Sequence, residues 1–160
     1  MKKYVVALLS FLFISQLTFC QAGGTSCSNA VTLTCGQTIG GSTLGVLPDN
    51  FDSGNFEGTA GQLWYTFTPL GSGTVEVSLC NNNTNYDTRV HVYSGSCGSL
   101  IFISEDDDAC VNPVFASDLV FSVSAGVTYL IRVGGSFTIA GTYQGTFSCY
   151  LSILGCTNPL

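Results

Sequence analysis

Five carboxylates in one part of the sequence have the chemistry to bind a metal ion. Glu105, Asp106, Asp107 and Asp108 are consecutive, and Asp87 precedes a strand-like stretch that leads toward them. Neighbouring acids repel one another and need water, a cation or a basic partner. Hard oxygen ligands at close spacing suit calcium, although the spacing is not that of an EF-hand. The alternative interpretation is a solvated acidic turn in which an aspartate accepts hydrogen bonds from backbone N–H groups.

A β-hairpin is expected to bring these acids together. Strand-like alternation covers residues 88–93 and 100–104, and a turn rich in Gly and Ser separates the two stretches. In an antiparallel hairpin the start of one strand faces the end of the other. The sequence therefore predicts that Asp87 lies near Glu105 and Asp106.

The single histidine is not part of a recognisable catalytic motif. His91 lies between Arg89 and Tyr93 on one strand face, and the sequence contains no GxSxG and no second histidine for HExxH. Adjacent acids in one turn are not two carboxylates held across a glycosidic bond. We therefore expect no catalysis, and a small secreted hydrolase is the weakest of the functions considered.

The N-terminus has the pattern of a signal peptide over residues 1 to about 22. Two lysines precede an apolar run over residues 4–19, and the sequence that follows is compatible with cleavage after Ala22. The run is shorter than the ~20 residues of a spanning helix, and no other stretch is apolar enough to span. In an alternative, lipoprotein-like interpretation, Cys20 carries a lipid and anchors the protein. Both interpretations predict export, to the medium or to the cell surface.

The chain that remains after the leader is strongly acidic. Arg89 and Arg132 are then the only strong bases against ten acids, a net charge of about −8. This charge disfavours binding to nucleic acids and to anionic membrane surfaces, and it suits cations. The expected partner is therefore an extracellular protein or a polysaccharide.

The cysteines of an exported chain are expected to form disulfides, and none has the CxxC spacing of a zinc site. Cys97 and Cys110 bracket the second hairpin strand and the acidic loop. A bond between them would hold the loop against the hairpin turn and stabilise the fold by about 3 kcal/mol. Cys27 and Cys35 flank a short apolar run and are predicted to bond locally, although either could instead reach Cys149.

Alternating apolar residues predict eight or nine strands and no helix after the leader. The predicted strands cover residues 38–44, 63–68, 74–80, 88–93, 100–104, 119–123, 127–133 and 145–154. An all-β, two-layer antiparallel sandwich of the jelly-roll type is the simplest architecture for this pattern. An immunoglobulin-like sandwich has a similar strand count, but Trp64 lacks the cysteine framing of an antibody-type domain. A long polar loop is expected over residues 48–62.

Three motifs are the most distinctive parts of the sequence. They are YDT, a strand and GSC over residues 86–97, the acidic cluster before Cys110, and Gly-x-x-Tyr-x-Ile-x-Val over residues 126–133. Together they resemble the pre-peptidase C-terminal domain, a bacterial secreted β-sandwich family. The resemblance implies a non-catalytic jelly-roll module of a larger protein, and some relatives bind calcium or an insoluble polymer such as collagen. The family cysteines expected near Ser53 and Phe102 are absent, so the family's disulfide pairing cannot be transferred.

The resemblance extends over nearly all of the chain after the leader and gives the expected domain boundaries. The leader covers residues 1–22, the sandwich residues 23–154 and a tail residues 155–160. The tail, GCTNPL, resembles the start of a short Cys-rich repeat of extracellular bacterial proteins, and Cys156 would then belong to a following module. The alternative is an ordinary C-terminus with a free or intermolecular thiol.

Two functions of different classes follow from these features. The first is a non-enzymatic accessory or adhesion module of a larger extracellular protein, with calcium as its candidate cofactor and no organic cofactor. The second is a free-standing carbohydrate-binding protein that uses surface aromatic residues, although most aromatic residues of such a sandwich belong to the core. The candidate stacking residues are Phe56, Trp64, Tyr65, Tyr86 and Tyr93.

Overall fold

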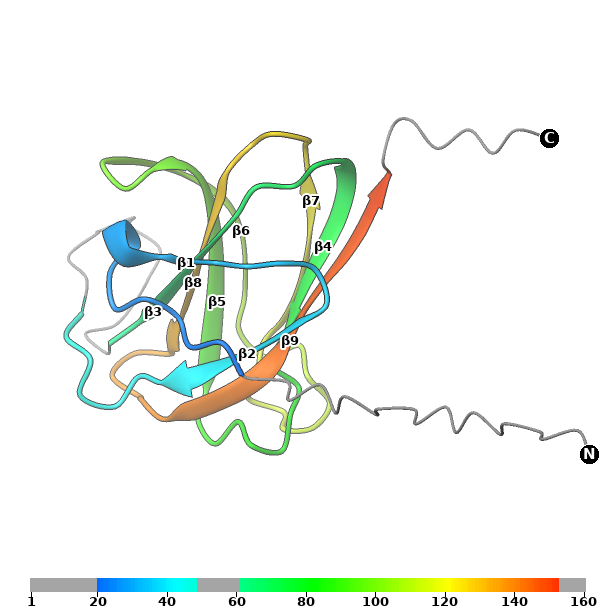
Figure 1. Ribbon diagram of the computed structural model, residues 1–160. Coiled ribbons are helices and arrows are strands. Elements are labelled where there is room, and N and C mark those ends of the chain that lie inside the picture. The colour runs from blue at the N-terminus through cyan, green and yellow to red at the C-terminus, as the bar shows by residue number, and fades with distance from the viewer. Residues whose placement is uncertain (1–19, 49–60, 153–160) are drawn as a thin grey trace, which may run out of the picture.

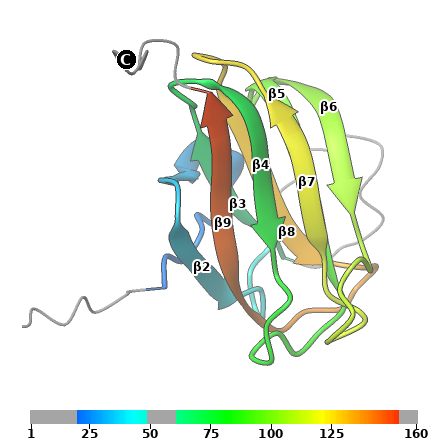
Figure 2. The same ribbon diagram turned by 90° about the vertical axis from the view of Figure 1, so that its right-hand side faces the viewer.

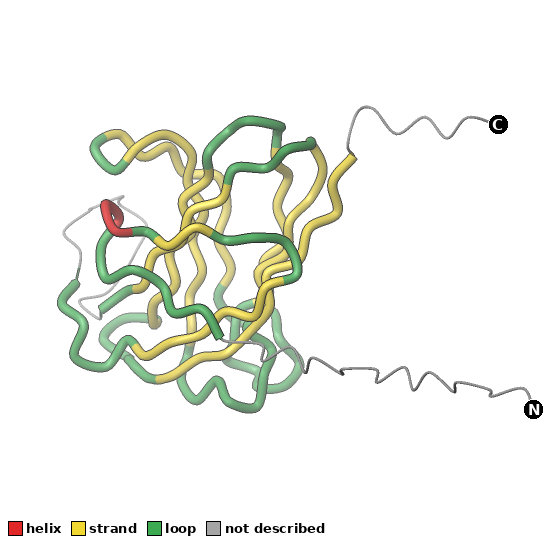
Figure 3. The backbone as a smooth tube through the Cα atoms, viewed as in Figure 1, coloured by secondary structure: helices red, strands yellow, loops and turns green. Residues whose placement is uncertain are grey.

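The computed structural model describes residues 20–48 and 61–152. These residues form nine β-strands and one short 3-10 turn, η1 (Cys27–Asn29) (Figures 1 and 3). The strands are β1 (Val31–Thr32), β2 (Gln37–Ser42), β3 (Leu63–Phe67), β4 (Ser72–Ser78), β5 (Thr88–Ser96), β6 (Ser99–Asp106), β7 (Asp118–Val123), β8 (Tyr129–Gly135) and β9 (Thr142–Ser152). The prediction of an all-β chain is confirmed.

The strands form two sheets that pack face to face. One sheet has the order β1-β3-β8-β5-β6 and the other the order β2-β9-β4-β7. Figure 2 looks onto the four-stranded sheet, with the five-stranded sheet behind it. The strand neighbours are antiparallel except β1 and β3, which are parallel. The predicted two-sheet sandwich is therefore confirmed.

The main core lies between the two sheets and is built from alternate residues of each strand. Val75 and Val77 of β4 are fully buried, as is Ile131 of β8. The rings of Phe67 and Phe147, from different sheets, meet with centroids 4.8 Å apart. Because successive side chains of a strand point to opposite faces, the alternating pattern of the sequence was sufficient to identify this core.

A second apolar cluster covers the outer face of the five-stranded sheet. Trp64 and Tyr93 are fully buried and pack with Cys27 and Leu130. A disulfide between Cys27 and Cys97 ties η1 to the turn between β5 and β6. Strand alternation does not reveal this second layer, because the covering segment comes from a distant part of the chain.

The segment before η1 joins the two sheets along one edge. The backbone of Gln21 bonds to β2, with its N–H donating to the Thr38 carbonyl at 3.0 Å and its carbonyl accepting from Gly40 at 3.1 Å. Gly24 exchanges two hydrogen bonds with Trp64 of β3, at 2.9 and 2.7 Å. Since β2 and β3 belong to different sheets, this short segment holds their edges together.

Several expectations fall on residues outside the described ranges. These are most of the leader, most of the long polar loop, the stacking candidate Phe56, and the tail with Cys156. Within residues 20–48 and 61–152, no helix is long and apolar enough to cross a membrane.

Candidate functional site

The predicted hairpin is present as β5 and β6, with a longer ladder than the sequence indicated. Val90 pairs with Asp106 and His91 pairs with Glu105, so both acids are strand residues and the acidic loop begins at Asp107. Successive strand side chains point to opposite faces of a sheet. Glu105 and Asp106 therefore point away from one another, and they do not act as one group.

The Glu105 side chain contacts basic residues on the outer face of the sheet. Its Oε2 atom lies 2.6 Å from Nε2 of His91 and 3.4 Å from Nη2 of Arg89. The His91 side chain is fully buried. This carboxylate therefore belongs to a cluster on the strand face and is separate from the loop carboxylates.

The Asp106 side chain organises the acidic loop. Its Oδ2 atom accepts hydrogen bonds from the backbone N–H of Asp118 at 2.8 Å and of Ala109 at 3.3 Å. Asp106 therefore acts as the solvated-turn interpretation expected of one aspartate, by accepting hydrogen bonds from backbone N–H groups. Asp106 thereby joins the end of β6 to the start of β7.

Ser117 completes this junction, although sequence reasoning did not single it out. Its Oγ atom lies 2.7 Å from the carbonyl oxygen of Thr88 and 3.1 Å from those of Asp106 and Asp107. Its backbone N–H donates to Oγ1 of Thr88 at 2.9 Å. Ser117 and Thr88 are both fully buried. No local signal marks this serine, because one of its partners lies 29 residues away along the chain.

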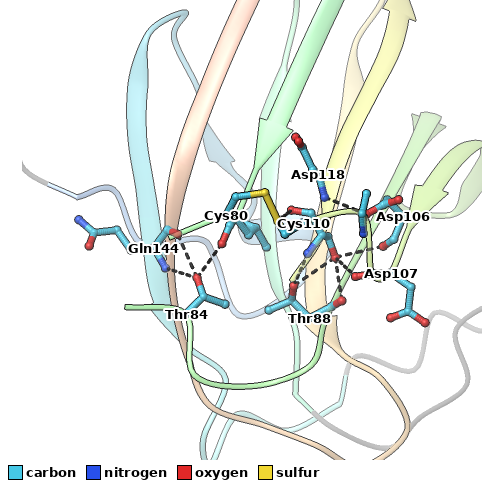
Figure 4. The surroundings of a disulfide bond; sticks show 11 residues. Cys80, Thr84, Thr88, Asp106, Asp107, Cys110, Asp118 and Gln144 are labelled. Atoms are coloured by element: carbon cyan, nitrogen blue, oxygen red, sulfur yellow. Dashed lines mark hydrogen bonds between the residues drawn. A yellow bond between two sulfur atoms is a disulfide. The ribbon is translucent and has the colours of Figure 1, made fainter. Parts of the chain in front are cut away.

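A disulfide attaches the acidic loop to the other sheet. Cys110, at the end of the loop, is bonded to Cys80, which follows β4. Figure 4 shows this bond between the Thr84–Gln144 hydrogen bonds on one side and Thr88 with the acidic loop on the other. The loop is thus fixed to β4 covalently and to β5 and β7 by hydrogen bonds.

The predicted disulfide pairing was wrong. The described residues form the bonds Cys27–Cys97, Cys35–Cys149 and Cys80–Cys110. Cys97 lies in the hairpin turn and Cys110 lies beyond the far end of β6, a strand of eight residues. At ~3.3 Å per residue these positions are roughly 25 Å apart, whereas the Cα atoms of a disulfide lie within about 7 Å. The local Cys27–Cys35 bond is also absent, and the alternative partner Cys149 binds Cys35.

Three carboxylates meet where β5 begins and β6 ends. One side-chain oxygen from each of Asp87, Asp107 and Asp108 lies within 4.8 Å of the others. The Oδ1 atoms of Asp87 and Asp107 are closed off from solvent and have no hydrogen-bond partner. Asp87 therefore does meet the acidic run, but two residues further along than the sequence predicted.

The electrostatics of this triad follow from burial and from mutual repulsion. Partial burial, followed by the charges of Asp107 and Asp108, raises the pKa of Asp87 to about 6. Burial also raises the pKa of Asp107, and the nearby Arg89 partly opposes that rise. The site therefore holds more negative charge than its neighbours neutralise, and it favours a proton or a cation.

The aromatic residues proposed to stack on a ligand are not at the surface. Trp64, Tyr65 and Tyr93 are fully buried, and Tyr86 is 4% exposed. These four side chains belong to the two apolar clusters. They therefore cannot form a stacking platform for a ligand that arrives from solution.

Comparison with known proteins finds similarity among solved structures. No protein-family model and no curated protein matches the sequence. Among solved structures, the chain is similar to the pre-peptidase C-terminal domain of a collagenase from Bacillus anthracis, with a TM-score of 0.50 and 13% identity. The similarity covers 78% of this chain and 96% of that domain. The resemblance found in the sequence is thus confirmed at the level of the fold, which is the fold of a pre-peptidase C-terminal domain.

Proposed function

We propose that this protein is a non-catalytic extracellular module of the accessory or adhesion type, stabilised by a calcium ion bound to Asp87, Asp107 and Asp108. The observation that carries the proposal is the convergence of three carboxylate oxygens within 4.8 Å. The Oδ1 atoms of Asp87 and Asp107 in this group are buried without a hydrogen-bond partner. A cation would supply the partner that these atoms lack.

Calcium fits this donor set better than other common metals. All three ligands are carboxylates, and hard oxygen donors suit calcium or magnesium rather than zinc or copper. Calcium accepts variable numbers of oxygens in flexible geometry, so loop carbonyls and water would complete its shell. By contrast, magnesium demands a near-ideal octahedron and is seldom held by protein ligands alone. We therefore expect an affinity in the ~0.1–1 mM range that is typical of extracellular modules.

Export and the absence of catalysis have separate support. Three disulfides in the described part of the chain suit an oxidising compartment. The similar solved structure is one named domain of a collagenase, which supports a role for this chain as a module of a larger protein. The single histidine is fully buried beside Glu105, where it cannot approach a substrate from solution.

We propose that the module binds a partner outside the cell, either an extracellular protein or a polysaccharide. We place its sandwich within residues 23–154 and propose that residues 155–160 begin a following Cys-rich module. The alternative of a carbohydrate-binding protein with surface aromatic residues loses four of its five stacking candidates to the core.

Thermal unfolding of the disulfide-intact protein at pH 7.5 tests the calcium site. At ~10 mM calcium and a Kd near 0.5 mM, linkage predicts stabilisation of about 2 kcal/mol, or roughly 5–8 °C in Tm. Magnesium at the same concentration serves as the control and is expected to give a smaller shift. An unchanged Tm between calcium and chelator would refute calcium binding.

A further inference from the structure

A polar pair buried between the two sheets ends on a backbone atom near the start of the folded chain. The hydroxyls of Tyr65 on β3 and Tyr143 on β9 lie 2.7 Å apart. The Tyr65 hydroxyl also donates to the carbonyl oxygen of Gln21 at 3.1 Å. Both tyrosines are almost completely buried, and burial raises the pKa of each. Both phenols therefore stay neutral, and the pair relies on this carbonyl as its final acceptor.

The backbone of Gln21 also pairs with β2 on both sides. Its N–H donates to Thr38 and its carbonyl accepts from Gly40. Residues 21–24 thus reach from β2 to β3 and link the two sheets. A chain that began at Gly23 would keep the Gly24 bonds to β3 and lose all of those to β2 and to the tyrosine pair.

This geometry bears on where the leader is removed. Cleavage after Ala22, which the leader pattern alone suggested, would discard Gln21 and leave a buried phenol without its acceptor. Cleavage after Cys20 would keep every one of these contacts. The small residues that signal peptidases favour three positions before the cut and immediately before it would then be Thr18 and Cys20.

Cys20 itself gives a second reason to place the cut after it. Its side chain is exposed and forms no disulfide with the described residues. A chain that kept Cys20 would carry into an oxidising compartment an exposed cysteine that has no disulfide partner among the described residues. A chain that starts at Gln21 has no such group at its N-terminus.

We infer that export cleaves the chain between Cys20 and Gln21, so that Gln21 is the first residue of the mature protein and closes the edge of the sandwich. The inference rests on the export that is part of the proposed function. After cleavage the Gln21 nitrogen still has a hydrogen to donate to Thr38. That holds for the free amine and also for the pyroglutamyl ring, in which this nitrogen bonds to the side-chain carbonyl carbon and ammonia leaves.

The first experiment is expression of the full chain with its own leader in a bacterial host, followed by intact mass and N-terminal peptide analysis of the exported protein. The expected N-terminus is Gln21, with or without the loss of one ammonia. A chain that starts at Gly23, or at a lipid-modified Cys20, would overturn the inference while leaving export intact. Unprocessed chain confined to the cytoplasm would overturn both.

The second experiment separates the structural argument from export. Chains that start at Gln21 and at Gly23, both ending at Leu160, are released from a cleavable fusion and oxidised. The longer chain is expected to melt about 5–10 °C higher, because the shorter one lacks bonds to buried groups. Tyr65→Phe in both chains is the control and is expected to shrink that difference. Equal melting temperatures for the two starting chains would overturn the role assigned to Gln21.

Discussion

Asp87 and Asp107 hold carboxylate oxygens within 4.8 Å of each other, and the Oδ1 atom of each is buried without a hydrogen-bond partner. Two like charges in this position repel each other, and the surrounding protein screens them less than water would. A proton or a divalent cation relieves the repulsion. The stability of the domain should therefore respond to pH and to calcium through the same pair of residues.

The pH dependence in chelator should have an unusual sign. Asp87 has a pKa of about 6 in the folded protein, against about 3.9 in an unfolded chain. The folded state therefore binds the proton more tightly, so stability is expected to fall as pH rises from about 4 to 6. Tm measured against pH in chelator tests this, with Asp87→Asn as the variant that should flatten the curve. An equally steep curve in that variant would assign the effect to other groups.

The affinity for calcium should itself depend on pH through Asp87. Protons and calcium compete for Asp87, so the apparent calcium affinity is expected to weaken as pH falls below about 6. Calorimetric titrations at pH 7.5 and at pH 5 measure the difference directly. An affinity that does not change between these two pH values would place the calcium elsewhere.

Neutralising one member of the triad should have opposite effects with and without calcium. In chelator, Asp107→Asn is expected to raise Tm by a few degrees, because it removes a repulsive charge while keeping the side-chain shape. In calcium, the same variant should lose most of the metal-dependent shift. Glu76→Gln on β4 is the matched control, since it removes one charge outside the triad and should retain the full shift. If both variants behave alike, the response reflects net charge and not a site.

Two of the disulfides should be separable by their effects on calcium. The Cys80–Cys110 bond spans 30 residues and the Cys35–Cys149 bond spans 114. Chain entropy predicts losses of about 3–4 and 4–5 kcal/mol when each pair is replaced by serine. Only the first replacement is expected to weaken calcium binding, because Cys110 ends the acidic loop. Denaturant unfolding and calcium titration of the two double variants distinguish these effects. An equal loss of calcium affinity in both would contradict the placement of the calcium site in the acidic loop.

Ser117 is expected to matter more than its size suggests. Ser117→Ala removes a hydroxyl whose oxygen lies within 3.1 Å of the carbonyl oxygens of Thr88, Asp106 and Asp107. The loss of bonds to buried acceptors should cost about 1–3 kcal/mol. Ser122→Ala, at an exposed position on β7, the strand that follows Ser117, serves as the control and should cost less than about 0.5 kcal/mol. Denaturant unfolding measures both, and similar costs for the two variants would contradict the role given to Ser117.

The hairpin and the core were predictable because they depend on local patterns. Alternating apolar residues identify strands, and glycine and serine mark the turn between β5 and β6. The predicted second strand ended at Ser104, before the acidic residues, which have low strand propensity. The ladder continues through Glu105 and Asp106 because His91, Arg89 and the backbone of β7 compensate their charges.

The disulfides and the junction at Ser117 were not predictable in the same way. Each joins segments that are adjacent only after the sheets have packed, and spacing along the chain carries no signal for them. The error over Cys97 and Cys110 follows from the shorter strand that was predicted over residues 100–104, because a five-residue strand leaves enough loop for the two cysteines to meet. The observed strand of eight residues, Ser99–Asp106, keeps them apart.

The position of the Cys35–Cys149 bond has a mechanical consequence. The bond closes a loop that contains nearly all of the sandwich, with a sequence separation of 114. In the proposed adhesion role the chain would be loaded in tension, and a pull applied at Cys35 and at Cys149 would pass through the sulfur atoms of this bond. The strands and loops between Cys35 and Cys149, including the acidic loop, would carry little of that load. The domain should therefore stay folded under forces that would extend the reduced chain.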